Sequence, residues 1–157
     1  MKKKIKSQDI VASPITYKLK GFFISRFTIV EPGLDITSNF EIQKLKLGLN
    51  LDFSNSFEDS TFRIILTITN QYELNSKDIK LLELMLISDF EIDDIQSVIQ
   101  INDEKFEVPD DLLTTFVSLT YSSARGIIFA KTQGSYLNQF ILPIVDPKLL
   151  IEQRLNN

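Results

Sequence analysis

The stretch that decides the fold runs from residue 44 to residue 53 and reads KLKLGLNLDF. Apolar side chains occupy every second position, and the residues between them are polar or glycine. This alternation predicts a β-strand with one apolar face and one polar face. The apolar face comprises Leu45, Leu47, Leu49, Leu51 and Phe53.

Three further segments also predict strands. Residues 15–30 are rich in β-branched and aromatic side chains, and Gly21 is at a position typical of a bulge. Residues 62–69 alternate again, and residues 79–87 predict a fourth strand that is apolar on both faces. Because one layer of helix would not cover both faces, we expect a second subunit to cover one of them. The two faces carry Leu81, Glu83, Met85 and Ile87 on one side, and Leu82, Leu84 and Leu86 on the other.

The last third of the chain has helical periodicity. Pro109, Asp110 and Asp111 are typical of a first helical turn, and apolar residues at spacings of three and four continue to about Lys131. Residues 138–145 predict an extended crossover, and Asp146 and Pro147 begin a final helix. We therefore predict an α+β fold: a four-stranded antiparallel meander, a long helix, an extended crossover and a C-terminal helix. Residues 1–14 are expected to be a flexible basic tail, and residues 15–157 a single domain.

Composition excludes many functions. The 157 residues contain no cysteine and no histidine, which removes thiolate nucleophiles, zinc–thiolate sites and imidazole bases. The formal net charge of −4 argues against a nucleic-acid partner. No apolar run is long enough to cross a bilayer, so we expect no membrane insertion and a cytoplasmic location.

No catalytic motif is present in the sequence. The acidic pairs Asp93–Asp94 and Asp110–Asp111 lack the spacing of a calcium loop and are best explained as turn and helix-start residues. Tyr121 and Lys131 are the other candidates for a general base, but the sequence shows no partner that would position either of them. We therefore predict no enzyme activity, no metal and no cofactor, and apolar surface is the main candidate for function.

Several motifs resemble the SecB family of export chaperones in their order and spacing. The long helix contains Ser123-Ala124-Arg125-Gly126, and the strands at residues 47–52, 62–69 and 81–92 match the family's second, third and fourth strands. The crossover and last helix match it at Gln139, Leu142, Pro143, Val145, Asp146 and Leu150.

This resemblance implies an ATP-independent holdase that binds unfolded polypeptides in apolar grooves, usually as a dimer of dimers. By the resemblance, the fourth-strand residues Leu82, Leu84 and Leu86 belong to subunit association, and Leu81 and Glu83 fit a position that docks the SecA motor. Arg26 and Val30 stand where acidic docking residues are expected, which puts SecA docking in doubt. The expected client-binding residues are Leu47, Leu49 and Leu51, extended here to Phe53, Phe140 and Leu142.

Other functional classes stay open at this point. A SecB-like chaperone of an antitoxin is a variant of the same hypothesis. An oligomeric adaptor would use its apolar faces only for assembly. A small-ligand carrier, or a carboxylate enzyme using Asp93, Asp94 or Glu83, would need a closed pocket in place of an open groove.

Overall fold

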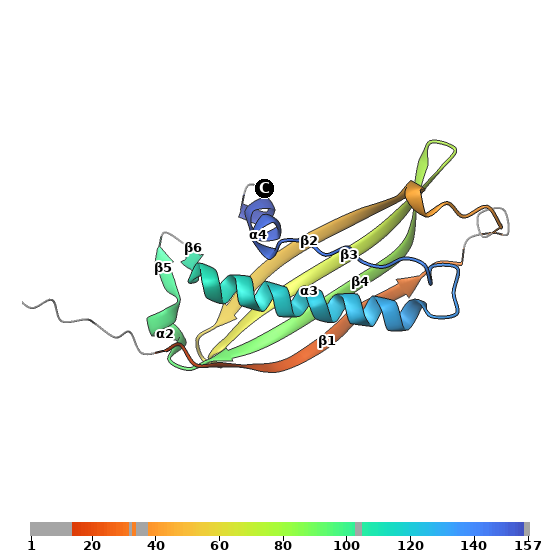
Figure 1. The fold of residues 1–157 in the computed structure, drawn as a ribbon. Coiled ribbons are helices and arrows are strands. Elements are labelled where there is room, and N and C mark those ends of the chain that lie inside the picture. The colour runs from red at the N-terminus through yellow and green to blue at the C-terminus, as the bar shows by residue number, and fades with distance from the viewer. Residues whose placement is uncertain (1–13, 32, 34–37, 103–104, 156–157) are drawn as a thin grey trace, which may run out of the picture.

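The computed structural model describes residues 14–31, 33, 38–102 and 105–155. Four long antiparallel strands form one sheet in the order β1-β4-β3-β2 (Figure 1). The predicted α+β fold is confirmed, whereas most of the predicted basic tail, residues 1–13, lies outside the described residues. The strands are β1 (Tyr17–Ile29), β2 (Leu45–Ser56), β3 (Thr61–Leu74) and β4 (Lys77–Ile92).

The connections explain this strand order. Strands β2, β3 and β4 follow one another as a meander, but β1 pairs with β4, so the sheet is not a simple four-stranded meander. Asn75 and Ser76 join β3 to β4, and both have positive φ angles, 50° and 61°. Two consecutive left-handed residues are the geometry of a type I′ hairpin turn, which suits the natural twist of the paired strands.

The two edge strands differ in regularity. The register of β1 against β4 shifts between Leu19 and Gly21 and again between Ile24 and Arg26, so the predicted bulge near Gly21 is present. Strand β2 pairs with β3 over residues 45–56 without any shift. The strict alternation that marks β2 in the sequence therefore corresponds to the most regular edge of the sheet.

Two helices follow the sheet, one long and one short. Helix α3 (Asp110–Thr132) crosses one face of the sheet, and Gly126 does not interrupt it (Figure 1). Helix α4 (Pro147–Leu155) packs beside β2 and the start of α3. Before α3 the chain forms the 3-10 turn η1 (Ile42–Lys44), the short helix α2 (Ile95–Val98) and a hairpin of β5 (Gln100–Asn102) and β6 (Lys105–Glu107).

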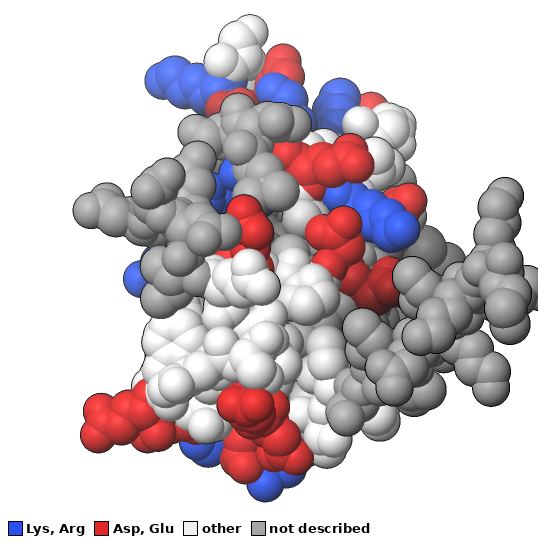
Figure 2. All heavy atoms as spheres, turned by 90° about the vertical axis from the view of Figure 1, so that its left-hand side faces the viewer, with Lys and Arg blue, Asp and Glu red and all other residues white. Residues whose placement is uncertain are grey.

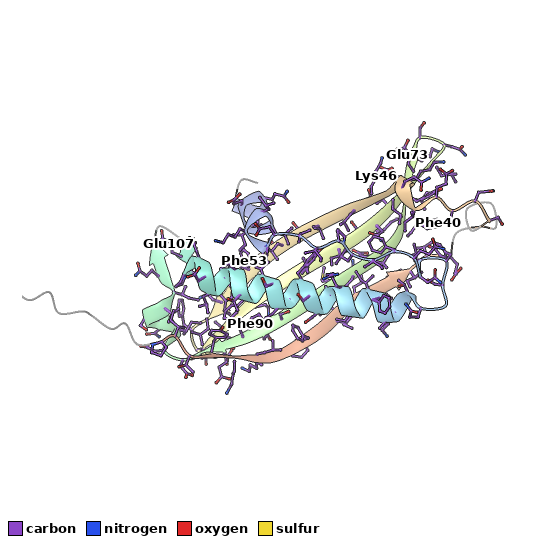
Figure 3. The ribbon with its side chains drawn as sticks, viewed as in Figure 1. Phe40, Lys46, Phe53, Glu73, Phe90 and Glu107 are labelled. Carbon is purple, nitrogen blue, oxygen red and sulfur yellow. The ribbon has the colours of Figure 1, made fainter. Side chains whose placement is uncertain are left out.

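The core lies between α3 and the sheet face that we call the inner face. The Phe116 ring of α3 stacks on the Phe90 ring of β4, with centroids 4.0 Å apart and planes 7° apart. It also contacts Tyr17 of β1 edge-on and the tilted ring of Phe62 of β3. Figure 3 shows Phe53 and Phe90 on either side of the first half of α3 in this view, and Phe40 at the opposite end of the sheet. Because directly paired residues share a face, Leu51, Leu66 and Leu86 extend this inner face across the sheet.

Candidate functional site

A hollow of about 520 Å³ lies between β2 and α4. Its apolar lining comes from Leu49 and Leu51 of β2, Leu66 of β3 and Leu150 of α4. Asn50, Asp52, Gln153 and Arg154 complete the lining. The alternation of β2 directs its leucines to the inner face, and α4 forms the opposite wall, so the hollow joins an apolar floor to a polar rim.

The six predicted client-binding residues occupy different environments. Leu47, Leu49 and Phe53 are half-buried, whereas Leu51, Phe140 and Leu142 are buried in the core. Of the six, the hollow includes Leu49 and Leu51. Phe53 stacks on Phe62, with centroids 6.0 Å apart, and so contributes to the core. Of the predicted client-binding residues, only those in the middle of β2 line the hollow. The crossover residues Phe140 and Leu142 are buried in the core and do not line an open groove.

The crossover between α3 and α4 is held by two side chains of α3. The Tyr121 hydroxyl donates to the carbonyl of Pro143 at 2.8 Å, and Nε of Arg125 donates to the carbonyl of Leu142 at 3.1 Å. Burial raises the pKa of Tyr121, and the charge of Arg125 opposes that shift, so the hydroxyl stays protonated at neutral pH. Tyr121 is therefore a hydrogen-bond donor that positions the crossover.

Charged groups around the hollow are paired. Nε of Arg154 lies 3.0 Å from Oδ1 of Asp52 and ties α4 to β2 across 102 residues of sequence. At the other end of β2, Lys46 pairs with Glu73 at 2.8 Å and with Asp78 at 2.9 Å (Figure 3). The two charged residues that line the hollow, Arg154 and Asp52, therefore carry no net charge together.

The assignment of Leu82, Leu84 and Leu86 to a subunit interface needs correction. All three side chains are fully buried within the single chain, on the inner face that α3 covers. The opposite side of β4 carries Glu83, Met85 and Ile87, which are half-buried on the outer face of the sheet. A strand that is apolar on both faces is thus explained by α3 on one side and partial exposure on the other.

The predicted position for docking the SecA motor, Leu81 and Glu83, does not offer an exposed apolar side chain beside a free carboxylate. A register shift between β3 and β4 leaves Leu81 outside the ladder, and its side chain is fully buried. Glu83 carries ion pairs of 3.2 Å to both Lys80 and Arg26. Its carboxylate is therefore already neutralised by the chain's own cations.

The sequence analysis missed the apolar surface of β1. Phe23 is 54% exposed and Ile24 45%, and Leu19 and Phe22 are also exposed. Helix α3 packs mainly on β3 and β4, so the middle of this edge strand stays exposed, whereas Phe27 and Ile29 pack against the core. The run Phe22-Phe23-Ile24 carried the signal, because consecutive apolar residues in a strand point to both faces. Leu119 and Phe129 on α3 and Ile141 and Ile144 on the crossover add exposed apolar side chains elsewhere.

The candidate acidic groups take structural positions. Asp110 and Asp111 lie in the first turn of α3, and Asp94 precedes α2 in a left-handed conformation with φ of 51°. Figure 2 views the end of the molecule where α3 begins, and acidic and uncharged side chains make up most of its described surface. Among the described residues, no group of three or more acidic side chains is placed to hold a metal ion. None of the helices in the described part of the chain is long and apolar enough to cross a membrane.

Comparisons with known proteins give two structural similarities. No protein-family model matches the sequence, and no curated protein matches it. A SecB-like chaperone of Mycobacterium tuberculosis, solved with a peptide from an antitoxin, has a TM-score of 0.46 and 14% identity, covering 82% of this chain and 90% of its own. A protein of unknown function from Streptococcus agalactiae has a TM-score of 0.45 and 10% identity, covering 85% of this chain and 99% of its own.

Proposed function

We propose that the protein is an ATP-independent chaperone that holds non-native polypeptide segments in the hollow between β2 and α4. The observation that carries this proposal is the apolar floor of Leu49, Leu51, Leu66 and Leu150, which lies beside an edge strand and within a rim of paired charges. In the sequence, the order of the motifs in the strands, the long helix and the crossover supports it.

The binding energy would come from burial of apolar client side chains. Each Å² of apolar area removed from water contributes about 25 cal/mol, so a leucine-sized side chain contributes about 2 kcal/mol. The hollow of about 520 Å³ takes only a short segment at a time. Affinity for a whole unfolded chain then requires several weak contacts, which suits reversible binding of many sequences without nucleotide hydrolysis.

Assembly of several copies is part of the same proposal. Strand β1 exposes Leu19, Phe22 and Ile24 on the inner face and Phe23 on the outer face, so its edge carries apolar side chains of the kind that oligomers bury. We propose a homo-oligomer, with a dimer of dimers as the expected form, acting in the cytoplasm. Exported precursors and antitoxins are the two client classes that fit.

The test is equilibrium binding of a fluorescently labelled, permanently unfolded client, measured by anisotropy. Leu49→Asp places a carboxylate on the floor of the hollow, and we expect it to weaken binding by about tenfold or more, because the charge loses water when the client binds. Ser54→Asp adds the same charge to an exposed site on the other face of β2 and is expected to change affinity less than about threefold. Equal affinity for all three proteins would contradict the proposal.

An oligomeric adaptor is a second candidate function. The observation that favours it is that the apolar side chains of β1 are more exposed than those of β2, which suits assembly better than client capture. An adaptor predicts a stable oligomer, measured by analytical ultracentrifugation, that does not bind the unfolded client.

A further inference from the structure

Strand β2 presents a regular free edge. It is the last strand of the sheet, and it pairs with β3 over residues 45–56 without a shift. It contains no proline. In contrast, β1 at the other edge is interrupted by two register shifts. Bulges and prolines are the usual devices that prevent an edge from pairing with another strand, and β2 has neither.

The hollow lies beside this edge and not over one face of β2. Four consecutive residues, Leu49 to Asp52, line it. Successive side chains of a strand point to opposite faces, and Arg154 of α4 pairs with Asp52, which faces away from the neighbouring Leu51, so the hollow borders the edge. The edge there carries the N–H and C=O groups of every second residue. Among the described residues, no backbone–backbone hydrogen bond joins this part of β2 to anything except β3.

The charges of the rim favour an uncharged occupant. Arg154 and Asp52 neutralise each other across the mouth of the hollow, and Lys46 is paired with two carboxylates at the start of the strand. A charged side chain of an incoming segment would find no free partner in this set of pairs. Both members of the Arg154–Asp52 pair are nearly half exposed, so moving them aside costs little.

Building on the proposed function, we propose that the client segment binds as an added β-strand on the edge of β2. The occupant is an extended, uncharged polypeptide segment without proline, whose apolar side chains recur at every second position. Its backbone pairs with the edge at Leu49 to Asp52, and its inward side chains lie against Leu49, Leu51 and Leu150. A strand rises about 3.3 Å per residue, so this part of the edge pairs with about four client residues.

Backbone N-methylation tests this mode of binding directly. The probe is a fluorescent seven-residue peptide of alternating serine and valine or leucine, and two variants carry N-methyl groups on its even or on its odd residues. Because only every second N–H of an added strand faces β2, one variant is expected to lose at least about tenfold in affinity and the other less than about threefold. Equal losses in both variants, or none in either, would overturn strand addition.

A cysteine cross-link locates the added strand. The chain has no cysteine, so Asn50→Cys supplies its single thiol, and Thr67→Cys, on the interior strand β3, is the matched control. Peptides with one cysteine at successive positions are expected to form disulfides with Asn50→Cys at alternate positions, and with Thr67→Cys at none. Cross-linking without this alternation, or equally with both variants, would contradict the placement.

The outcomes separate the two proposals. If the unfolded client binds but the peptide is insensitive to N-methylation, strand addition fails and the holdase function stands. If neither the unfolded client nor the unmodified peptide binds, the proposed function fails and strand addition fails with it. If the client binds but the unmodified peptide does not, strand addition at the β2 edge is overturned and the holdase function stands.

Discussion

Phe116 is the residue around which the core is organised. Its ring contacts three other aromatic rings, Phe90, Phe62 and Tyr17, and is fully buried. We expect Phe116→Ala to lower the free energy of unfolding by about 3–5 kcal/mol, because it leaves a cavity and removes aromatic contacts. Urea denaturation measures this loss. Leu119→Ala, on the exposed side of the same helix, is expected to stay within about 0.5 kcal/mol of the wild type, and a similar loss in both would refute this role for Phe116.

The outer face of the sheet carries two arginine–carboxylate ion pairs, Arg63–Asp89 and Arg26–Glu83, and the carboxylate of the first is the more buried. Arg63 donates to both carboxylate oxygens of Asp89 at 2.7 and 2.8 Å, and the Asp89 side chain is only 8% exposed. Arg63→Ala would leave that carboxylate nearly buried and without this partner, so we expect a loss of about 2 kcal/mol in unfolding free energy. Arg26→Ala should have a much smaller effect, because Glu83 keeps Lys80. Thermal denaturation measures both losses, and an equal loss of stability in Arg63→Ala and Arg26→Ala would contradict this distinction.

Glu83 gives a pH-dependent prediction. The hydrogen bond from Lys80 is the largest cause that lowers the pKa of Glu83 below 4.5, and Arg26 lowers it further. A carboxyl pKa that is lower in the folded state adds stability above pH 4.5, and this contribution is lost as the pH falls through the folded pKa. We expect an NMR titration to give a pKa below 4.5, raised more by Lys80→Met than by Arg26→Met. A pKa of 4.5 or above in the wild type would contradict this.

At the scale of elements, the crossover depends on two side chains of α3. Tyr121→Phe removes the hydrogen bond to Pro143, so we expect it to lower the free energy of unfolding by about 1 kcal/mol. Combined with Arg125→Gln, it should also speed limited proteolysis between Ile141 and Ile144, both of which are exposed. Ser122→Ala, exposed on the same helix, is the control. Unchanged cleavage in the double variant would show that the crossover is held by packing alone.

The strands and helices could largely be predicted from the sequence because their periodicity is local. Residues 44–53 show the period of two that becomes β2, and Pro109 with Asp110 marks the start of α3. The partner of β1 could not be predicted, because the pairing of β1 with β4 depends on contacts far apart in the chain. The placement of Leu82, Leu84 and Leu86 failed for a related reason: periodicity shows that both faces of β4 are apolar but not which face α3 covers.

The candidate site could be predicted only in part. Leu49 and Leu51 follow from the alternation of β2, but the opposite wall, Leu150 and Arg154, comes from a helix about 100 residues later. Nothing in the local pattern shows that Arg154 pairs with Asp52. The crossover residues Phe140 and Leu142 alternate with exposed Ile141, so their apolar character was evident while their burial depended on α3.

At the scale of the whole molecule, apolar surface is divided between two edges of one sheet. The β1 edge is bulged and carries exposed aromatic side chains, and the β2 edge is regular and borders a hollow. This division fits assembly at one edge and client binding at the other. It predicts that substitutions at Leu49 and at Phe23 act on different properties, the first on client affinity and the second on oligomer mass.

Aggregation of an unfolding client protein, followed by light scattering without nucleotide, tests the central claim most directly. We expect the wild-type protein to suppress scattering at about one oligomer per client, Ser54→Asp to do the same, and Leu49→Asp to lose most of the suppression while keeping its circular dichroism spectrum. A folded wild-type oligomer that leaves the scattering unchanged would contradict the holdase function and favour the adaptor.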